Sequence, residues 1–316
     1  MSDATAKLRV IRTEAGADDV LTITLARDDG QDLPDWQPGS HVDLILPAGI
    51  ERQYSLCGPI DNPREWQISV LHTLESRGGS DWIHANVRAQ ETLTVRGPRN
   101  KFPLVEAQHY LFIAGGIGIT PILPMIKSLI ARGHEDWRLV FGGRSRTSMA
   151  HLAELEPYAD HVTVWPEDEK GRLDLETILG SPRIGTAVYC CGPEGLIKAV
   201  ERQCRSWPPG TLHVERFRPA PDTGDNVDTA FEVTAAVSGV SVIVEVGQTI
   251  VEALEGYGVS IPTSCGEGVC GTCETRVLSG VPDHRDSVLS PEERASGTTI
   301  IPCRSRALSP ALELDV

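Results

Sequence analysis

The sequence predicts a multidomain fold: an antiparallel β-barrel at 1–105, an α/β domain with a parallel sheet at 106–219, a linker at 220–229 and a small α+β domain at 230–316. Three patterns support this prediction. The first hundred residues contain evenly spaced short strands separated by Gly, Pro and Asp, which is typical of an antiparallel barrel. From about residue 106, apolar strands alternate with helical segments, which indicates a parallel sheet. Further along, a cysteine motif follows a predicted β-hairpin. A chain of 316 residues is long enough to form a separate hydrophobic core in each of these domains.

Two polar segments stand out in the barrel, whose strands we expect at 7–12, 20–25, 41–46, 66–71 and 92–95. In Arg52-Gln-Tyr54-Ser55, strand alternation places Arg52 and Tyr54 on the same face. In Ser76-Arg77-Gly78-Gly79-Ser80, a glycine turn leads into a predicted helix at 81–87, which makes an anion site with an adjacent arginine. Taken singly, the first segment is more often a solvated strand edge with a packed ring, and the second is more often an ordinary turn.

The α/β domain contains two glycine-rich segments that directly follow strands. Gly115-Gly116-Ile-Gly118-Ile-Thr120 lies between an apolar strand and a predicted helix at 122–132, an arrangement that lays a pyrophosphate on a helix N-terminus. It is not the Gly-x-Gly-x-x-Gly fingerprint, so a standard dinucleotide-binding fold is not supported. Cys191-Gly192-Pro193 follows a later strand. Because ligands bind at the carboxyl ends of such strands, we expect the two segments to meet, although Cys190-Cys191 is also consistent with two buried small residues.

The cysteine motif Cys265-Gly-Glu-Gly-Val-Cys270-Gly-Thr-Cys273, with Cys303 further on, has the plant-type spacing for a 2Fe-2S cluster. The glycines between the cysteines suit a loop that wraps closely around an inorganic core. Structural zinc prefers two pairs of closely spaced ligands, and disulfide frameworks belong to small secreted proteins, so these alternatives fit less well. Around the motif we expect a hairpin at 231–246 that turns at Gly239, and a short helix at 249–256.

These motifs carry a resemblance to known proteins. Residues from about 230 to 316 resemble a plant-type ferredoxin, and the Arg52 and Arg77 segments resemble the FMN-dependent branch of the ferredoxin reductase superfamily. Cys191-Gly192-Pro193 resembles the nicotinamide-side motif of the same superfamily, and 213–217 resembles its closing strand. In this order, the whole chain resembles the phthalate dioxygenase reductase family. The resemblance therefore implies an FMN-binding barrel, an NAD-binding domain and a ferredoxin domain.

The resemblance also assigns roles to individual residues. It gives catalytic roles to Ser55, Cys191 and Phe217, with Phe217 near the junction of flavin and nicotinamide. It gives FMN binding to Arg52, Tyr54, Ser55, Leu56, Leu71, His72, Arg77, Gly78, Gly79 and Ser80. It gives nucleotide binding to Gly116, Gly118, Thr120, Arg144, Cys191, Gly192, Pro193 and Phe217. The cluster ligands are Cys265, Cys270, Cys273 and Cys303.

Electron counting suggests why three cofactors share one chain. A nicotinamide gives up a hydride, a 2Fe-2S cluster accepts one electron at a time, and a flavin converts between the two. We therefore expect an NADH-dependent reductase that passes single electrons to a terminal oxygenase, with a Rieske non-haem iron oxygenase as the favoured partner. Three alternatives remain: a haem-thiolate monooxygenase as partner, a flavin oxidoreductase that acts directly on a small molecule, and a non-enzymatic redox sensor. Arg144-Ser-Arg146 also leaves NADPH open, because arginine pairs with a 2′-phosphate.

Charge and composition limit the partners. The formal net charge of −15 argues against nucleic acid, and no apolar run reaches membrane-spanning length. The start of the chain has no apolar signal region, and the other cysteines have no framework spacing, so we expect a cytoplasmic monomer. The segment from residue 229 onward contains twelve acidic residues and five arginines, so its net charge is −7. A basic surface of the partner is therefore expected to dock beside the cluster loop, near Glu267 and Glu274.

Overall fold

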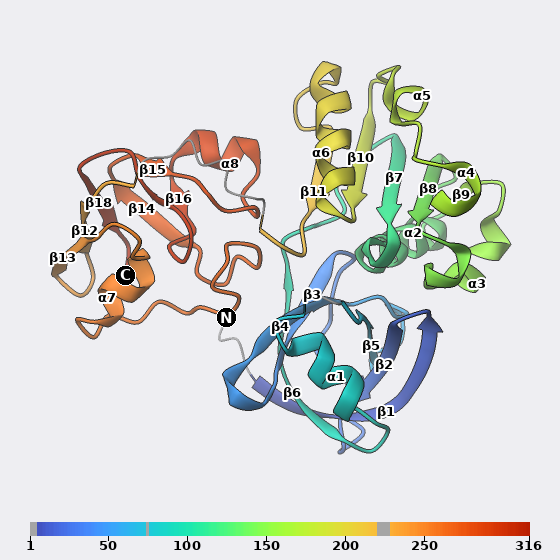
Figure 1. The fold of residues 1–316 in the computed structure, drawn as a ribbon, viewed down its shortest axis with the longest axis horizontal. Helices are drawn as coiled ribbons and strands as arrows, with labels where there is room; N and C mark the ends of the chain where they lie inside the picture. Colours follow the sequence, from blue (N-terminus) through green and yellow to red (C-terminus); the bar gives the residue numbers. More distant parts are fainter. Residues whose placement is uncertain (1–4, 74–75, 220–227) are drawn as a thin grey trace. The chain divides into compact units, whose positions relative to one another are not determined.

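The computed structural model describes residues 5–73, 76–219 and 228–316. The chain forms two compact units, Met1–Glu215 and Arg216–Val316 (Figure 1). Most of the linker predicted at 220–229 lies outside the described residues, so its extent stays a prediction, as do the other predicted domain boundaries. No helix in the described ranges is long and apolar enough to cross a membrane.

The first part of unit one is the predicted antiparallel barrel, called here the barrel lobe. Its elements are β1 (Thr5–Ala17), β2 (Val20–Ala26), β3 (Ser40–Ile45), the 3-10 turn η1 (Pro47–Gly49), β4 (Glu51–Ser55), β5 (Trp66–Leu71), α1 (Gly79–Asn86) and β6 (Thr92–Asn100). The strands form one six-stranded sheet in the order β4-β3-β6-β1-β2-β5. A bridge between Leu56 and Ile68 joins the two edges, so the sheet curls onto itself around a core of alternate strand residues.

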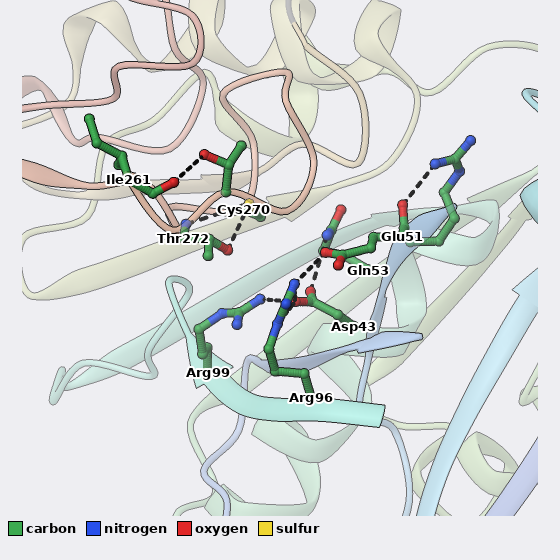
Figure 2. Close-up of polar contacts among 10 residues, drawn as sticks. Asp43, Glu51, Gln53, Arg96, Arg99, Ile261, Cys270 and Thr272 are labelled. Atoms are coloured by element: carbon green, nitrogen blue, oxygen red, sulfur yellow. Dashed lines mark hydrogen bonds and ion pairs between the residues drawn. The ribbon is translucent and has the colours of Figure 1, made fainter. Parts of the chain in front are cut away.

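A buried ion cluster ties three strands of the barrel together. Figure 2 shows the side chain of Asp43 on β3 between Arg96 and Arg99 of β6, with Gln53 of β4 donating to Asp43 at 3.1 Å. The Arg96 guanidinium is 2.9 Å from Asp43 and also pairs with Glu51. Burial alone would raise the pKa of the Asp43 carboxyl, but the two arginines outweigh that effect and lower it. Asp43 is therefore a paired buried charge, the form in which a carboxylate is tolerated inside a protein.

The second part of unit one is the predicted parallel sheet, called here the α/β lobe. Its strands are β7 (His109–Gly115), β8 (Trp137–Gly143), β9 (Val162–Pro166), β10 (Thr186–Cys191) and β11 (Leu212–Glu215). Its α-helices are α2 (Ile119–Ala131), α3 (Leu152–Leu155), α4 (Glu167–Lys170), α5 (Leu175–Leu179) and α6 (Glu194–Gln203), with 3-10 turns η2 (Gly116–Gly118), η3 (Arg146–Ser148), η4 (Glu156–Tyr158) and η5 (Cys204–Ser206). All paired strands are parallel, in the order β11-β10-β7-β8-β9.

Alternation along β10 explains how this sheet is covered on both faces. Tyr189 and Cys191 belong to the core that contains α2, whereas Val188 and Cys190 belong to the core that contains α5 and α6. The two adjacent cysteines therefore point to opposite faces of the sheet. Because β10 is buried on both faces, its residues form a continuous apolar run in the sequence.

The second unit is the predicted mixed domain. Its elements are β12 (Phe231–Ala235), β13 (Val240–Val244), α7 (Ile250–Glu255), β14 (Thr275–Ser279), β15 (Pro282–Asp283), α8 (Pro291–Ser296), β16 (Thr299–Ile300), β17 (Arg306–Ala307) and β18 (Ala311–Leu314). The main sheet has the order β13-β12-β18-β14-β16. The expected hairpin is β12 and β13 with Gly239 at φ 68°, and Thr249 caps α7 in a reciprocal box with Glu252.

Candidate functional site

The two polar segments of the barrel lobe meet at the start of α1. The guanidinium of Arg52 donates to the carbonyl oxygen of Arg77 at 2.7 Å, although β4 and this loop are 25 residues apart in sequence. A Cβ on Gly79 would lie 2.6 Å from the Arg52 side chain, so only glycine permits this approach. Gly78 is the N-cap of α1 with φ 83° and offers no side chain to the first turn. The Ser76 hydroxyl accepts from the backbone N–H groups of Gly78 and Asp81 at this helix start. Together with the Arg52 guanidinium, such N–H groups are donors of the kind that a phosphate requires.

Ser80 and Tyr54 both make contacts within the barrel lobe. The hydroxyl of Ser80 donates to Ser76 at 3.1 Å. Tyr54 packs partly against the barrel core, and burial raises the pKa of its hydroxyl group.

The three remaining residues predicted to contact the flavin differ in exposure. Leu56 is completely buried in the barrel core, which does not support direct contact with a ligand. Leu71 ends β5 and is half-buried. His72 follows directly and is more exposed, and it lies 2.8 Å from Asp81 in the first turn of α1. Their roles toward the flavin stay predictions.

The two glycine segments of the α/β lobe meet as expected. The strand order reverses between β7 and β10, which are neighbours in the sheet, and this switch point is where open α/β sheets bind ligands. A Cβ on Gly118 would lie 2.2 Å from the carbonyl oxygen of Cys191. One on Gly192 would lie 2.9 Å from Cα of Gly115. The backbones therefore touch at a distance that excludes any side chain.

The other predicted nucleotide-binding residues surround this contact or lie at its rim. Gly116 has φ 54° and open space around it. The hydroxyl of Thr120 donates to the Ile117 carbonyl at 2.9 Å, which closes the turn at the start of α2. Pro193 is the N-cap of α6. Arg144 is exposed just beyond β8, one strand away from the switch point.

A polar contact joins the two lobes beside this turn. The hydroxyl of Ser55, at the end of β4, donates to the carboxylate of Glu215 at the end of β11, at 3.4 Å. Glu215 is paired in register with the buried Cys191. Burial raises the pKa of Glu215 to about 8, although the Ser55 hydroxyl offsets part of that rise. Burial, and then the Glu215 charge, raise the pKa of the Cys191 thiol, which therefore stays neutral.

Glu215 is the residue that the sequence prediction missed. The closing strand was predicted, but strand periodicity does not distinguish a charged residue that faces solvent from one that faces another lobe. Its position two residues before Phe217, which was assigned a role, was the available signal. Phe217 is 40% exposed and lies in the second unit, so its predicted place at the flavin stays untested.

The four motif cysteines converge in the second unit. Cys270, Cys273 and Cys303 are buried, Cys265 is partly exposed, and none of the eight cysteines is in a disulfide. The thiols lie near enough to shift one another's pKa: Cys270 and Cys303 act on Cys265, and Cys265 and Cys273 act on Cys303. In the described part of the chain, no three His, Cys, Asp or Glu side chains are grouped closely enough to hold a single metal ion. A two-iron cluster spreads its four ligands over two centres, so it does not need three ligands around one ion.

Backbone donors around the thiols match the needs of such a cluster. The N–H of Glu267 donates to the sulfur of Cys265 at 3.3 Å, and the N–H of Thr272 donates to that of Cys270 at 3.5 Å. The Thr272 hydroxyl also lies 3.1 Å from the Cys270 sulfur, as Figure 2 shows. Left-handed glycines at 266, 268 and 271 turn these groups inward. The loop thus presents N–H groups to sulfurs that carry negative charge when they bind iron.

Comparisons with known proteins agree with this arrangement. A family model described as an oxidoreductase NAD-binding domain matches residues 112–202, and one described as a 2Fe-2S iron-sulfur cluster binding domain matches residues 233–308. Phenoxybenzoate dioxygenase subunit beta of Ectopseudomonas oleovorans is 42% identical over 317 residues, which cover 99% of this chain and 98% of that protein.

Two solved structures are similar over 99% of this chain. Phthalate dioxygenase reductase, described as a modular structure for electron transfer from pyridine nucleotides to 2Fe-2S, has a TM-score of 0.73 and 33% identity, with 98% of that chain covered. An intact type IV self-sufficient cytochrome P450 monooxygenase has a TM-score of 0.93 and 44% identity. This chain spans 41% of the length of that monooxygenase.

The contact at Gly118 leads to a first prediction. In Gly118→Ala the new methyl group must push the turn away from the Cys191 backbone, so we expect the Kd for NADH to rise about tenfold or more, equivalent to about 1.4 kcal/mol or more. Flavin content should not change. Gly256→Ala, at the end of α7, has an ordinary φ of −58° and meets no atom closer than 3.5 Å, so it is the control. Equal Kd values for the two variants would contradict the predicted role of the turn.

The raised pKa of Glu215 leads to a second prediction. Between about pH 4.5 and 8 the folded protein keeps a proton that the unfolded chain loses, so the contribution of Glu215 to stability falls as the pH rises through this window. Glu215→Gln removes that loss. Relative to the native protein, the free energy of unfolding of the variant should rise by about 2 kcal/mol between pH 5 and 8, because residual solvent contact reduces the full effect. Denaturant titrations at each pH measure the free energy of unfolding, and the exposed Glu156→Gln is the control. If the difference between Glu215→Gln and the native protein does not change with pH, the pKa of Glu215 is not raised.

Proposed function

Since this chain belongs to the phthalate dioxygenase reductase family, we propose that it is the reductase component of an oxygenase system, oxidising NADH and delivering single electrons to a terminal oxygenase. One observation carries the proposal. A phosphate site at α1, a nucleotide turn at the β7 and β10 switch point, and four converging thiols occur in one chain, in the order of a solved electron-transfer reductase. When bound, FMN accepts a hydride from NADH and the 2Fe-2S cluster accepts single electrons.

The residues of this chain have distinct tasks in that reaction. Arg52 and the start of α1 hold the phosphate of FMN, and Ser55 presents a hydroxyl group at the boundary of the two lobes. Glu215 keeps its proton near neutral pH, so no fixed negative charge opposes the arrival of an electron pair beside it. Cys191 and Gly118 form a close backbone contact that sets the depth of the nicotinamide site.

The surroundings of Arg144 favour NADH over NADPH. Arg146, two residues further on, is already paired with Glu169 at 2.8 Å. Asp168 of the same helix donates its backbone N–H to the Arg144 carbonyl, so the acidic helix α4 borders this rim. A 2′-phosphate there would meet carboxylates as well as arginines, whereas a ribose hydroxyl would meet hydrogen-bond acceptors.

Electrons leave through the cluster loop of the second unit. Cys265 is the partly exposed ligand, and Glu267 and Glu274 flank the loop with carboxylates. Because this segment carries a net charge of −7, the partner surface that docks beside it is basic. A Rieske oxygenase is the favoured partner. The 44% identity to part of a self-sufficient cytochrome P450 monooxygenase supports a haem monooxygenase as the second candidate.

We also place the protein in the cytoplasm as a monomer. All eight cysteines are unbridged, as in a reducing compartment, and four of them are needed as thiolates for iron.

A spectroscopic titration tests the proposal. We expect flavin and iron-sulfur absorption bands in the purified protein, and both should bleach together when NADH is added without oxygen. FMN should be released on denaturation. In Cys303→Ser the flavin should still be reduced at close to the native rate, whereas electron transfer to cytochrome c should fall at least tenfold, because the cluster is lost.

Other outcomes would redirect the proposal. Release of FAD would remove the family branch from which the partner was inferred. A preference for NADPH would contradict our interpretation that the acidic helix α4 disfavours a 2′-phosphate. Rapid turnover of a quinone or another small acceptor by Cys303→Ser, at the native rate, would favour a flavin oxidoreductase that acts directly on small molecules.

Docking beside the acidic loop predicts a salt effect. Raising the ionic strength should slow reduction of cytochrome c, a basic one-electron acceptor, more than reduction of a small neutral acceptor. Glu267→Gln and Glu274→Gln should weaken that difference, and Glu255→Gln, exposed on the same domain, is the control. Equal salt sensitivity for both acceptors would exclude this docking site.

A further inference from the structure

A second polar connection between the lobes lies away from the Ser55 contact. His151, directly before α3 in the α/β lobe, places Nε2 2.9 Å from the hydroxyl of Ser69 on β5 of the barrel lobe. Ser69 is in turn 2.9 Å from the hydroxyl of Thr22 on β2 and 3.6 Å from the sulfur of Cys57. These groups are buried: Thr22 is 6% exposed, Ser69 4% and Cys57 0%.

The other ring nitrogen of His151 anchors the network in the α/β lobe. Nδ1 is 2.6 Å from a carboxylate oxygen of Glu154 on α3, and the second oxygen of Glu154 pairs with Lys127 on α2. The imidazole side chain is 5% exposed and has a partner on each side. His151 therefore connects the helices that cover one lobe to the interior strands of the other. The chain distance between Ser69 and His151 is 82 residues.

The backbone of His151 has an unusual, left-handed conformation that the bonds of its side chain stabilise. Its φ is 63°, in the left-handed region that residues with a Cβ rarely adopt and that costs about 1 kcal/mol or more. Glycine would fit this backbone at no cost but would leave Ser69 without a partner across the boundary. A residue held in such a conformation persists only where its surroundings fix it, here through bonds to both lobes.

A backbone hydrogen bond lies at the same boundary. The N–H of Asp18, in the turn between β1 and β2, donates to the carbonyl oxygen of Thr147 at 2.8 Å. Thr147 precedes His151 by four residues in the same loop. Among the described residues, this network makes no hydrogen bond to Ser55, Cys191 or Glu215, so its effect on them is indirect.

We propose that His151 is a positioning residue for hydride transfer, which sets the angle between the barrel lobe and the α/β lobe by bonding to Ser69 on one side and Glu154 on the other. The inference rests on the proposed function, in which the barrel lobe holds the flavin and the α/β lobe holds the nicotinamide. Hydride transfer needs its two reacting atoms about 3 to 3.5 Å apart, and a misplacement of about 1 Å can cost about a hundredfold in rate. A network that fixes the lobes therefore controls the rate without touching the reacting atoms.

Two variants test this from opposite sides of the boundary. His151→Asn keeps a residue that tolerates the left-handed backbone but is too short to reach Ser69, and Ser69→Ala removes the partner in the barrel lobe. Each should lower the rate of flavin reduction at saturating NADH about tenfold or more, while the Kd for NADH and the flavin content stay within about twofold. The double variant should be no slower than the slower single variant, because both remove the same bond.

The control is Tyr110→Phe, which removes a hydroxyl group bonded to Val105 and Ala107, neither of which belongs to the His151 network. Its rate should stay within about twofold of the native protein. Amide hydrogen exchange supplies a readout that is independent of NADH: the Asp18 amide should exchange faster in His151→Asn and Ser69→Ala but not in Tyr110→Phe.

The outcomes separate this inference from the proposed function. Native rates in both boundary variants, or equal losses in Tyr110→Phe, would overturn the positioning role. If NADH does not reduce even the native protein, the proposed function fails. In that case amide exchange still tests the connection between the lobes, and unchanged exchange of the Asp18 amide in His151→Asn and Ser69→Ala would reject it.

Discussion

Contact between backbones at the carboxyl ends of β7 and β10 is the constraint on which the proposed nicotinamide site depends. Gly118 and the Cys191 carbonyl lie so close that no Cβ fits between them, which fixes the backbone at the switch point of the sheet. The end of β11 pairs with this same stretch of β10 and brings Glu215 to the boundary of the barrel lobe. Ser55 meets it there from β4. The reacting region is thus assembled from strand ends, which hold side chains more rigidly than loops do.

The sequence is most informative where the signal is local. The first three motif cysteines, the glycine turn after β7 and the Arg77 loop each lie within about ten residues, so the pattern itself carries the geometry, whereas Cys303 lies thirty residues further on. Strand and helix periodicity predicted the three main sheets, whose strand orders the structure supplies. The side chain of Leu56 is completely buried in the barrel core, so the flavin role predicted for this position would have to involve its backbone.

What the sequence did not predict depends on contacts between distant segments. The Asp43 cluster joins strands that are more than 50 residues apart, and the contact of Ser55 with Glu215 spans 160 residues. His151 lies in an ordinary local sequence, so its left-handed backbone and its bond to Ser69 have no local signal. Charged or polar residues at such positions look like solvated ones until the tertiary fold is known.

The unequal exposure of the four cluster cysteines has a consequence for the durability of the protein. Cys270, Cys273 and Cys303 are buried, and Cys265 sits in the part of the loop that solvent reaches. Oxygen, peroxide and chelators would therefore reach a bound cluster from the side on which we propose that the electron acceptor docks. An acceptor seated on that side would also act as a shield, so the lifetime of the cluster in air depends on how often the reductase is in complex. A cell that makes the reductase in excess of its oxygenase would lose the unshielded fraction first.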